Sequence, residues 1–513
     1  MKKLLITLSA VATFTLSASA ENVKATVHAD QAGAKINKEI YGQFSEHLGS
    51  CIYGGLWVGE DSQIPNIKGY RKDVFEALKA LKIPVLRWPG GCFADDYHWM
   101  DGIGPKDQRP SLRNNNWGGT IEDNSFGTHE FLNLCEMLGC EPYISGNVGS
   151  GTVKEMAQWV EYMTSDGDTP MARLRRANGR DKAWHVKYFG IGNEAWGCGG
   201  NMSPEYYSDE FRKFNTYLRD QGDNRLYRIA SGASDYDYNW TKVMMQNART
   251  KMDALSLHYY TCKGWTGSKG SATQFTTEEY YNVLAKTCEI EEVLKNHFAI
   301  MDAYDPDKKV ALILDEWGTW FDVEPGTNPG WLFQQNTMRD AMVAALNLNI
   351  FQKHTDRLKM ANIAQIVNVL QAMILTDGEK MVLTPTYHVF RMFNVHQKAT
   401  YVPSDYQTGN IVSAEGRIMD DFSACASRDA AGKLHVSLAN PYLDKPVTVE
   451  LAFDQLKPKT VTGEILKADR INAYNEFGKA PAVAPVAFTG AKATGKGVKL
   501  TLPAASVVVL EIQ

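Results

Sequence analysis

Short apolar runs alternate with helical patterns along most of the chain. Eight runs, rich in β-branched and aromatic residues and ending in polar residues or glycine, are predicted to be strands: 39–47, 84–91, 142–150, 186–194, 227–234, 253–260, 310–318 and 362–370. The segments between them carry helical periodicity, for example 72–82, where apolar residues face one side. Strict alternation of strand and helix indicates parallel strands. Eight units whose apolar strands must be buried on both faces predict a (β/α)8 TIM barrel over residues 39–398.

The alternative arrangement is an open, doubly wound sheet. It is disfavoured because no glycine-rich GxGxxG turn follows the first strand.

The helical period disappears after about residue 398. Segments such as "KLHVSLANP", "PVTVELAF" and "SVVVLEIQ" alternate apolar and polar residues and are separated by turns rich in Gly, Pro and Asp. This pattern predicts a C-terminal antiparallel β-sandwich over 399–513. The strand-like stretch in segment 21–38 has no place in the barrel, so we expect it to join the sandwich.

The first twenty residues have the composition of a secretory signal. Two lysines precede an apolar run and the small residues Ala18-Ser19-Ala20. The apolar run is too short for an uncleaved membrane anchor, which needs about 18 or more residues. These observations predict cleavage after Ala20 and export to the periplasm or the extracellular space.

Composition and charge exclude several kinds of partner. The 513 residues are 44% hydrophobic and 22% charged, which is typical of a globular protein. The formal net charge of −5 disfavours a nucleic-acid partner, and no later segment is apolar enough to predict a membrane partner. The eight cysteines permit disulfides, but their wide spread favours buried thiols, and none has zinc-site spacing. We expect neither a metal nor a cofactor, and no GxSxG elbow of a serine hydrolase is present.

Polar side chains collect where the predicted barrel strands end. In such barrels the active site lies at the carboxyl ends of the strands. The residues at these ends are Glu46, His47, Arg87, Asn193, Glu194, His258, Tyr260, Glu316, Trp317, Trp320, Gln365 and Asn368. Their convergence on one rim predicts a catalytic site there.

Glu194 and Glu316 end the fourth and seventh strands, which face each other across the mouth of a ring of eight. Two facing carboxylates suit glycoside hydrolysis, and a separation of roughly 5–5.5 Å gives retention of configuration. The acid needs a pKa raised by burial and by a neighbouring negative charge. Arg87 is the candidate to keep the second carboxylate, the nucleophile, ionised.

Each of these residues also has a structural interpretation. "GNE" is a short motif that a glycine-rich turn can carry, and His258 on an apolar strand can be a core histidine. Arg87 can be part of a structural ion pair, and the neighbouring tryptophans can be packing residues. Asp315 is expected to point away from the mouth if Glu316 points into it. The catalytic interpretation is favoured because all these residues fall at the same end of successive strands.

Six blocks of the sequence resemble a known family in order and spacing. They are "YGQFSEHLG", "RWPGGCFADDYHWMDGIGP", "YFGIGNEAWGCGG", "ALSLHYYT", "LILDEWGTW" and "NIAQIVNVLQAMILT". Together they resemble the α-L-arabinofuranosidases of glycoside hydrolase family 51. The resemblance implies a retaining exo-hydrolase that releases terminal α-L-arabinofuranosyl groups from arabinan, arabinoxylan and their oligosaccharides.

The resemblance also implies residue roles. Glu194 matches the acid/base, Glu316 the nucleophile, and Asn193 the amide that binds the sugar 2-hydroxyl. The remaining positions match residues that line or adjoin the arabinose subsite: Glu46, Arg87, Cys92, His258, Tyr260, Trp320 and Gln365. The segment "YTCKGWTGSKGSATQFTTEEYY" after the sixth strand departs from the family pattern, so the preferred polymer stays open.

Three further points stay open at the level of sequence. The same machinery can serve another glycoside, because barrel and carboxylates do not fix the sugar. A non-catalytic glycan-binding protein is the alternative of another class; it is disfavoured because such a protein needs neither Glu194 nor Glu316. Oligomers are common in the family, so a homo-oligomer is among the states that the resemblance allows.

Overall fold

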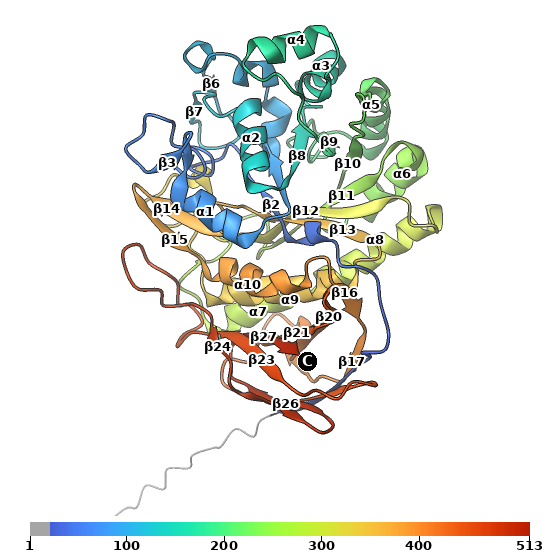
Figure 1. Cartoon of the computed structure of the whole chain (residues 1–513), viewed down its shortest axis with the longest axis vertical. Coiled ribbons are helices and arrows are strands. Elements are labelled where there is room, and N and C mark those ends of the chain that lie inside the picture. The colour runs from blue at the N-terminus through green and yellow to red at the C-terminus, as the bar shows by residue number, and fades with distance from the viewer. Residues whose placement is uncertain (1–20) are drawn as a thin grey trace, which may run out of the picture.

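A closed barrel of eight parallel strands forms the larger part of the molecule (Figure 1). The computed structural model describes residues 21–513, and the predicted signal segment lies outside them. The barrel strands, in their order around the ring, are β2 (Gly42–Phe44), β5 (Val85–Trp88), β8 (Glu141–Gly146), β9 (Tyr188–Ile191), β10 (Tyr227–Ser234), β11 (Ala254–Thr261), β12 (Ala311–Thr319) and β13 (Leu358–Ala364). The predicted fold class is therefore confirmed.

Helices connect the strands and surround the ring. They are α1 (Lys72–Leu81), α2 (Thr128–Leu138), α3 (Val153–Thr164), α4 (Pro170–Ala177), α5 (Pro204–Tyr217), α6 (Tyr238–Ala248), α7 (Thr277–Cys288), α8 (Ile290–Tyr304), α9 (Met338–Lys353) and α10 (Pro385–Phe393). Three small hairpins extend the loops: β3 (Asn66–Ile67) with β4 (Tyr70–Arg71), β6 (Leu112–Arg113) with β7 (Ile121–Glu122), and β14 (Ile374–Asp377) with β15 (Lys380–Leu383).

The eighth strand differs from its prediction. The sequence pattern predicts residues 362–370, whereas β13 spans Leu358–Ala364. The charged Lys359 interrupts the apolar pattern at the start of the strand, so the prediction begins too late. The apolar stretch after Ala364 is buried but is not a strand. Its amide groups make local bonds instead, such as Gln365 N–H to the Val369 carbonyl at 3.0 Å.

The C-terminal part consists of two packed, mainly antiparallel sheets with their own apolar core. One sheet contains β17 (Ser404–Tyr406), β1 (Glu21–Val27), β22 (Val447–Phe453), β26 (Gly497–Leu502) and β25 (Ala491–Thr494). The other contains β16 (Thr400–Val402), β20 (Ser423–Arg428), β21 (Leu434–Asn440), β27 (Ser506–Ile512), β23 (Val461–Leu466) and β24 (Val486–Ala487). A separate hairpin joins β18 (Asn410–Val412) to β19 (Ile418–Asp420).

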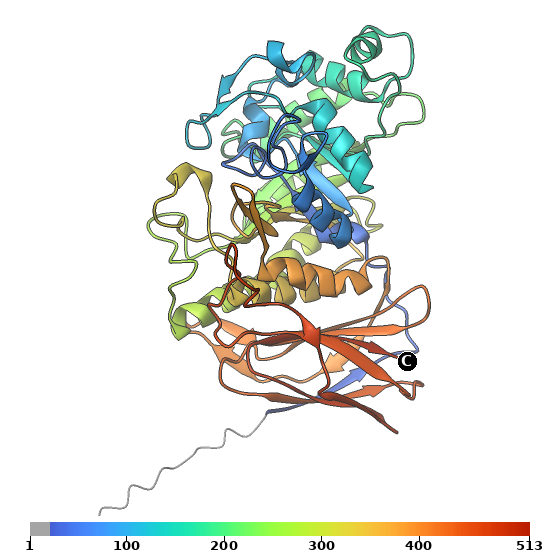
Figure 2. The ribbon, with the colours of Figure 1, turned by 60° about the vertical axis from the view of Figure 1, so that its left-hand side comes forward.

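Strand β1 lies inside the sandwich rather than at its edge. It pairs in parallel with β22 and antiparallel with β17, so that Ala25 lies opposite both Leu451 and Tyr406. Figure 2 shows this blue strand among the orange and red strands of the sandwich. Strand β22 pairs with β1 along its whole length, and β17 pairs with its last three residues, Ala25 to Val27, so that these three have partners on both sides.

Helix α9 lies between barrel and sandwich (Figure 1). Its residues from Met338 to Gln352 are all buried, as expected for a helix that has no solvent face. Asn349 on α9 accepts a hydrogen bond of 2.6 Å from Ser437 of β21. Within residues 21–513, no helix has both the length and the apolar character needed to cross a bilayer.

Candidate active site

A pocket of about 820 Å³ opens at the carboxyl ends of the barrel strands. Its lining residues are Glu46, Leu48, Gly91, Cys92, Trp117, Glu194, Trp196, Ser234, Tyr260, Trp265, Glu316, Trp320, Leu332, Gln365 and Leu370. Seven of the ten residues that the sequence singles out line it, including both members of the predicted carboxylate pair. Arg87 and Asn193 lie in direct contact with these residues, and so does His258.

Glu316 lies on β12 and is held by two donors. Arg87 Nη1 donates to Oε1 at 2.8 Å, and the Tyr260 hydroxyl donates to Oε2 at 2.8 Å. Gly91 passes close by, because a Cβ atom at this position would lie 2.9 Å from Glu316 Oε1. Glu316 is only 5% exposed, so these contacts, rather than water, fix the orientation of its carboxylate.

Glu194 lies in the turn that follows β9. Its φ of +39° is in the left-handed region, which is costly for a side chain other than glycine. The turn is closed by N–H groups of Gly197 and Gly199, which donate to the Glu194 carbonyl at 2.7 and 3.1 Å. A Cβ atom on Gly199 would lie 1.8 Å from the Asn193 carbonyl oxygen, so only glycine fits there.

The environment of Glu194 favours its protonated form. Burial raises the pKa of this carboxyl and Glu316 raises it further, while the hydrogen bond with His258 acts against this rise. His258 Nδ1 lies 2.8 Å from Glu194 Oε1. One oxygen of each carboxylate and this ring nitrogen all lie within 4.8 Å of one another. The two carboxylates therefore lie as close together as a retaining glycosidase requires, and closer than the roughly 6.5–9.5 Å of an inverting one.

Asp315 faces the site instead of pointing away from it. Its carboxylate accepts a hydrogen bond of 2.6 Å from Tyr143 and lies 3.1 Å from His258 Nε2 and 3.7 Å from Arg87 Nε. The expectation that Asp315 points away assumed that successive side chains alternate strictly between the two faces of the strand. The register of β12 against β13 shifts between Leu314 and Trp317, and this irregularity brings two successive carboxylates to the same cluster.

Charge balance explains the state of His258. Burial lowers its pKa, but Glu316, Asp315 and Glu194 together raise it to about 10. The cations of Arg87 and His258 thus lie among the three carboxylates of Glu194, Asp315 and Glu316.

Glu46 follows β2 and gathers four hydrogen-bond donors. Its Oε1 accepts from the backbone N–H groups of Gly91 and Phe93 and from Trp117 Nε1, at 2.8–3.1 Å. Gln365 Nε2 donates to Oε2 at 2.9 Å. Burial and Glu316 nevertheless raise the pKa of Glu46 to about 7.

Two buried polar atoms beside the pocket have no partner in the described part of the chain. They are Asn193 Nδ2 and Gln365 Oε1. Asn193 is held in place from two sides: its Oδ1 accepts from Arg87 Nη2 at 2.5 Å, and its backbone N–H donates to Asp95 at 2.9 Å. Buried polar groups are almost always paired, so these two atoms are available for a ligand.

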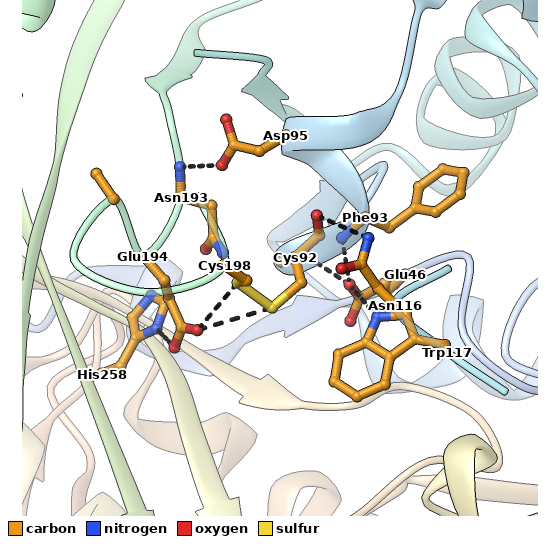
Figure 3. Close-up of a disulfide and its surroundings, with 12 residues drawn as sticks. Glu46, Cys92, Phe93, Asp95, Asn116, Trp117, Asn193, Glu194, Cys198 and His258 are labelled. Atoms are coloured by element: carbon orange, nitrogen blue, oxygen red, sulfur yellow. Dashed lines mark hydrogen bonds and ion pairs between the residues drawn. A yellow bond between two sulfur atoms is a disulfide. The ribbon is translucent and has the colours of Figure 1, made fainter. Parts of the chain in front are cut away.

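A disulfide joins Cys92 to Cys198 in the wall of the pocket (Figure 3). The bridge connects the loop after β5 to the turn after β9. The sulfur of Cys198 lies 3.5 Å from Glu194 Oε2. Disulfide sulfur carries no proton, so this is a packing contact that desolvates the carboxylate. The other six cysteines are thiols.

Two strand-end residues serve the fold instead of the pocket. His47 lies in an aromatic cluster and accepts a hydrogen bond of 3.1 Å from Trp88 Nε1. Asn368 Nδ2 donates to the Ser50 carbonyl at 3.0 Å and to the Thr376 hydroxyl at 2.7 Å.

The sequence prediction missed Trp117 and Trp265. Both lie on loops outside the barrel strands, so position at a strand end could not identify them. The only sequence signal was an aromatic residue in an otherwise polar loop. Trp265 is 52% exposed, and its ring contacts those of Tyr260 and Trp320.

A TIM barrel with acidic residues after its fourth strand and on its seventh defines a class, the barrel glycoside hydrolases. Family models narrow this class. The model described as "Alpha-L-arabinofuranosidase 1 domain" matches residues 77–279, and "Alpha-L-arabinofuranosidase C-terminal domain" matches residues 315–506.

Whole-chain similarity identifies the family within that class. An intracellular exo-α-L-arabinofuranosidase of Bacteroides ovatus is 62% identical, with 100% of this chain and 99% of the relative covered. The GH51 arabinofuranosidase structure from Xanthomonas axonopodis pv. citri is 50% identical with a TM-score of 0.94, covering 96% of this chain and 100% of that one. The arabinose complex of the Thermotoga maritima enzyme is 32% identical with a TM-score of 0.84, covering 95% and 99%. The chain belongs to the α-L-arabinofuranosidases of glycoside hydrolase family 51.

The same comparison corrects the predicted location. The Bacteroides ovatus relative carries the name of an intracellular enzyme, which contradicts the expectation of signal cleavage after Ala20 and export. The expectation came from the composition of the first twenty residues alone. A short apolar run after two lysines has little specificity, because ordinary sequences contain the same residue types.

Proposed function

We propose that this protein is a retaining, exo-acting α-L-arabinofuranosidase. In this proposal Glu316 attacks the anomeric carbon of a terminal arabinofuranosyl group while Glu194 donates its proton to the departing oxygen. The Glu194 carboxylate then takes a proton from a water molecule, which attacks the glycosyl-enzyme and releases arabinose with its configuration retained. Membership of the family and the name of the Bacteroides ovatus relative support the exo-activity.

The observation that carries this assignment is the contrast between two neighbouring carboxylates. Glu194 is half-buried, with its side chain 18% exposed, lies close to Glu316, and has a raised pKa, as a general acid requires. Glu316 instead accepts hydrogen bonds from Arg87 and Tyr260, which aim its oxygens. One carboxyl thus keeps a proton while the other is directed towards the pocket.

The remaining residues bind the sugar in this proposal. Asn193 Nδ2 and Gln365 Oε1 have no partner and offer a donor and an acceptor to its hydroxyls. Glu46 accepts from further hydroxyls, and Trp320 presents an aromatic face to the C–H surface of the substrate. Cys92 closes the wall beside Glu194 as part of the disulfide.

We propose arabinan, arabinoxylan and arabino-oligosaccharides as substrates. The segment after β11, which carries Trp265 into the pocket wall, is the part of the chain that we expect to discriminate among these polymers. Assembly into a homo-oligomer stays a prediction, which light scattering of the purified protein measures.

Hydrolysis of two aryl α-L-arabinofuranosides, one with a good and one with a poor leaving group, tests the roles. We expect Glu194→Ala to lower kcat/KM by about 10²–10⁴ for the poor leaving group, and far less for the good one, because only the former needs protonation. Azide should restore part of the Glu194→Ala activity on the activated substrate and yield the α-linked arabinofuranosyl azide, in which the configuration is retained. In Glu316→Ala, azide should give no retained product.

Glu122→Ala is the matched control, because this buried glutamate lies outside the pocket lining. Equal turnover by wild type, Glu194→Ala and Glu316→Ala would rule out the proposed mechanism.

A further inference from the structure

A second pocket lies where the segment after β11 meets α7 and the β18–β19 hairpin. Its volume is about 610 Å³, and it shares no lining residue with the catalytic pocket. We call it the basic pocket, because five basic residues line it: Lys263, Lys269, Lys286, Arg339 and Arg417.

Arg339, at the start of α9, is the buried member of this set. It is 1% exposed, and its guanidinium lies between the rings of Phe275 and Phe321, with its central carbon 3.8 Å from each centroid. Both faces of the guanidinium are therefore covered, and only its edge can make hydrogen bonds.

Only some of the N–H groups at the edge of the Arg339 guanidinium make hydrogen bonds. Within residues 21–513 its side-chain hydrogen bonds go to the backbone carbonyls of Ser271 and Ala272, at 3.4 and 3.1 Å, and none goes to a carboxylate. Its Nε has no partner. Burial lowers the pKa of Arg339 to about 10, so the group is still a cation at neutral pH. The carboxylates of Asp340 and Glu279 act against this lowering of the pKa, but the side-chain hydrogen bonds of Arg339 go to neither of them. An anion that accepts from the free edge of the guanidinium would further offset the cost of burying this charge.

Two lysines add charge outside any ion pair, although Lys269 is close enough to Asp322 to lower the pKa of that carboxyl. Among the described residues, neither Lys263 nor Lys269 has an ion-pair partner. Lys286 and Arg417 differ, because both contact the Glu289 carboxylate. The positive charges that have no ion-pair partner therefore lie on the Arg339 side of the pocket and on the segment after β11.

The acidic groups near the basic pocket are already engaged. Glu279 accepts from the Thr276 backbone N–H at 2.8 Å and so caps α7. Glu415 lies 3.4 Å from Arg417 Nε. Asp322 accepts from Ser268 and from the Lys269 backbone N–H. Glu279 is close enough to raise the pKa of Arg339, but Arg339 donates no hydrogen bond to any of these three carboxylates.

We propose that the basic pocket is a binding site for a compact oxyanion, a carboxylate or a phosphate, held by Arg339, Lys263 and Lys269. Phe275, Phe321 and Val283 give the pocket apolar walls beside these cations, which suits an anionic group carried on a small organic frame. Two sources share this chemistry: a free oxyanion and a uronic acid carried on a glycan. Lys269 also borders the catalytic pocket, since its ammonium lies 5.8 Å from the Trp320 ring centroid.

Calorimetric titration of the full chain with inorganic phosphate, D-glucuronate and neutral D-glucose, at constant ionic strength, tests the site. We expect saturable binding of one oxyanion per chain and none of glucose. Lys263→Ala/Lys269→Ala should weaken binding at least tenfold, because these two ammonium groups make charge-assisted contacts. Lys242→Ala, which removes an exposed lysine elsewhere, is the matched control and should bind as the wild type does.

Glu194→Gln should also bind as the wild type does, which separates this site from the catalytic pocket. Binding of glucuronate but not phosphate would assign the site to a sugar-borne carboxylate, and the reverse would assign it to a free oxyanion; both outcomes support the proposal. Absence of saturable binding by both probes, or equal affinity in wild type and Lys263→Ala/Lys269→Ala, would overturn it. Neither of these two results would bear on the hydrolase mechanism, which is measured separately.

Discussion

At the scale of single residues, His258 couples the two catalytic carboxylates of the proposed mechanism. Its Nδ1 lies 2.8 Å from Glu194 and 3.5 Å from Glu316, and its Nε2 lies 3.1 Å from Asp315. An imidazolium in this position stabilises the ionised form of Glu194, which is why it opposes the rise in that residue's pKa. The histidine therefore helps to set the pH above which the acid loses its proton.

We predict that His258→Gln moves the alkaline limb of the kcat/KM profile to higher pH. Removing the imidazolium removes an interaction that lowers the pKa of Glu194, while burial and Glu316, which raise it, remain. Glu194 then keeps its proton at higher pH. The measurement is the pH dependence of kcat/KM on an arabinofuranoside with a poor leaving group, with the exposed His185→Gln as control. An alkaline limb that stays in place or moves to lower pH contradicts this account.

At the scale of elements, the loops after β5 and β9 bring distant parts of the sequence to one wall. In Figure 3 the disulfide lies between the Glu194–His258 pair and the Glu46–Trp117 pair. The bridge closes a loop of 106 residues. Closing a loop of this length restricts the unfolded chain strongly, so the bridge should contribute measurably to stability.

We expect Cys92→Ser/Cys198→Ser to lower the free energy of unfolding by about 2–5 kcal/mol. Urea denaturation measures this change. Reductant should bring the wild type to the same level and leave the double variant unchanged, and Cys288→Ser, which removes a thiol outside the bridge, serves as control. Equal stability of the oxidised wild type and the double variant would show that the bridge does not constrain the chain.

Sequence patterns predicted the barrel well because strands buried on both faces leave long apolar runs. Position at a strand end identified Glu194, Glu316 and their main hydrogen-bond partners for the same reason. The pattern failed for β13, whose start carries the charged Lys359, and for Asp315, where an irregular register ends the simple alternation. The disulfide could not be predicted, since the pairing of two cysteines depends on where unrelated loops meet.

At the scale of the whole molecule, α9 makes barrel and sandwich depend on each other. It is buried along its length and contacts strands of both parts. All twelve tryptophans lie between residues 57 and 331, in the barrel, so tryptophan fluorescence reports on the barrel alone. Tryptophan fluorescence can therefore measure how far the stability of the barrel depends on the sandwich.

We predict that Leu510→Ala, a fully buried position in the sandwich core, lowers the stability measured by tryptophan fluorescence. A substitution of this kind costs about 2–5 kcal/mol, and we expect the whole loss to appear in the barrel signal because the two parts unfold together. Circular dichroism should give the same midpoint. A fluorescence midpoint that stays at the wild-type value would mean that the barrel unfolds independently.

The place of β1 in the sandwich has a consequence for synthesis. Its partners in β22 lie 426 residues further along the chain, as the pairing of Glu21 with Val447 shows. At roughly 5–20 residues per second, the ribosome needs about 20–85 s to make them. During that interval β1 lacks its β22 partner while the ribosome synthesises the barrel. The sandwich therefore closes last, and a nascent chain interrupted before β22 carries an unpaired strand at its beginning.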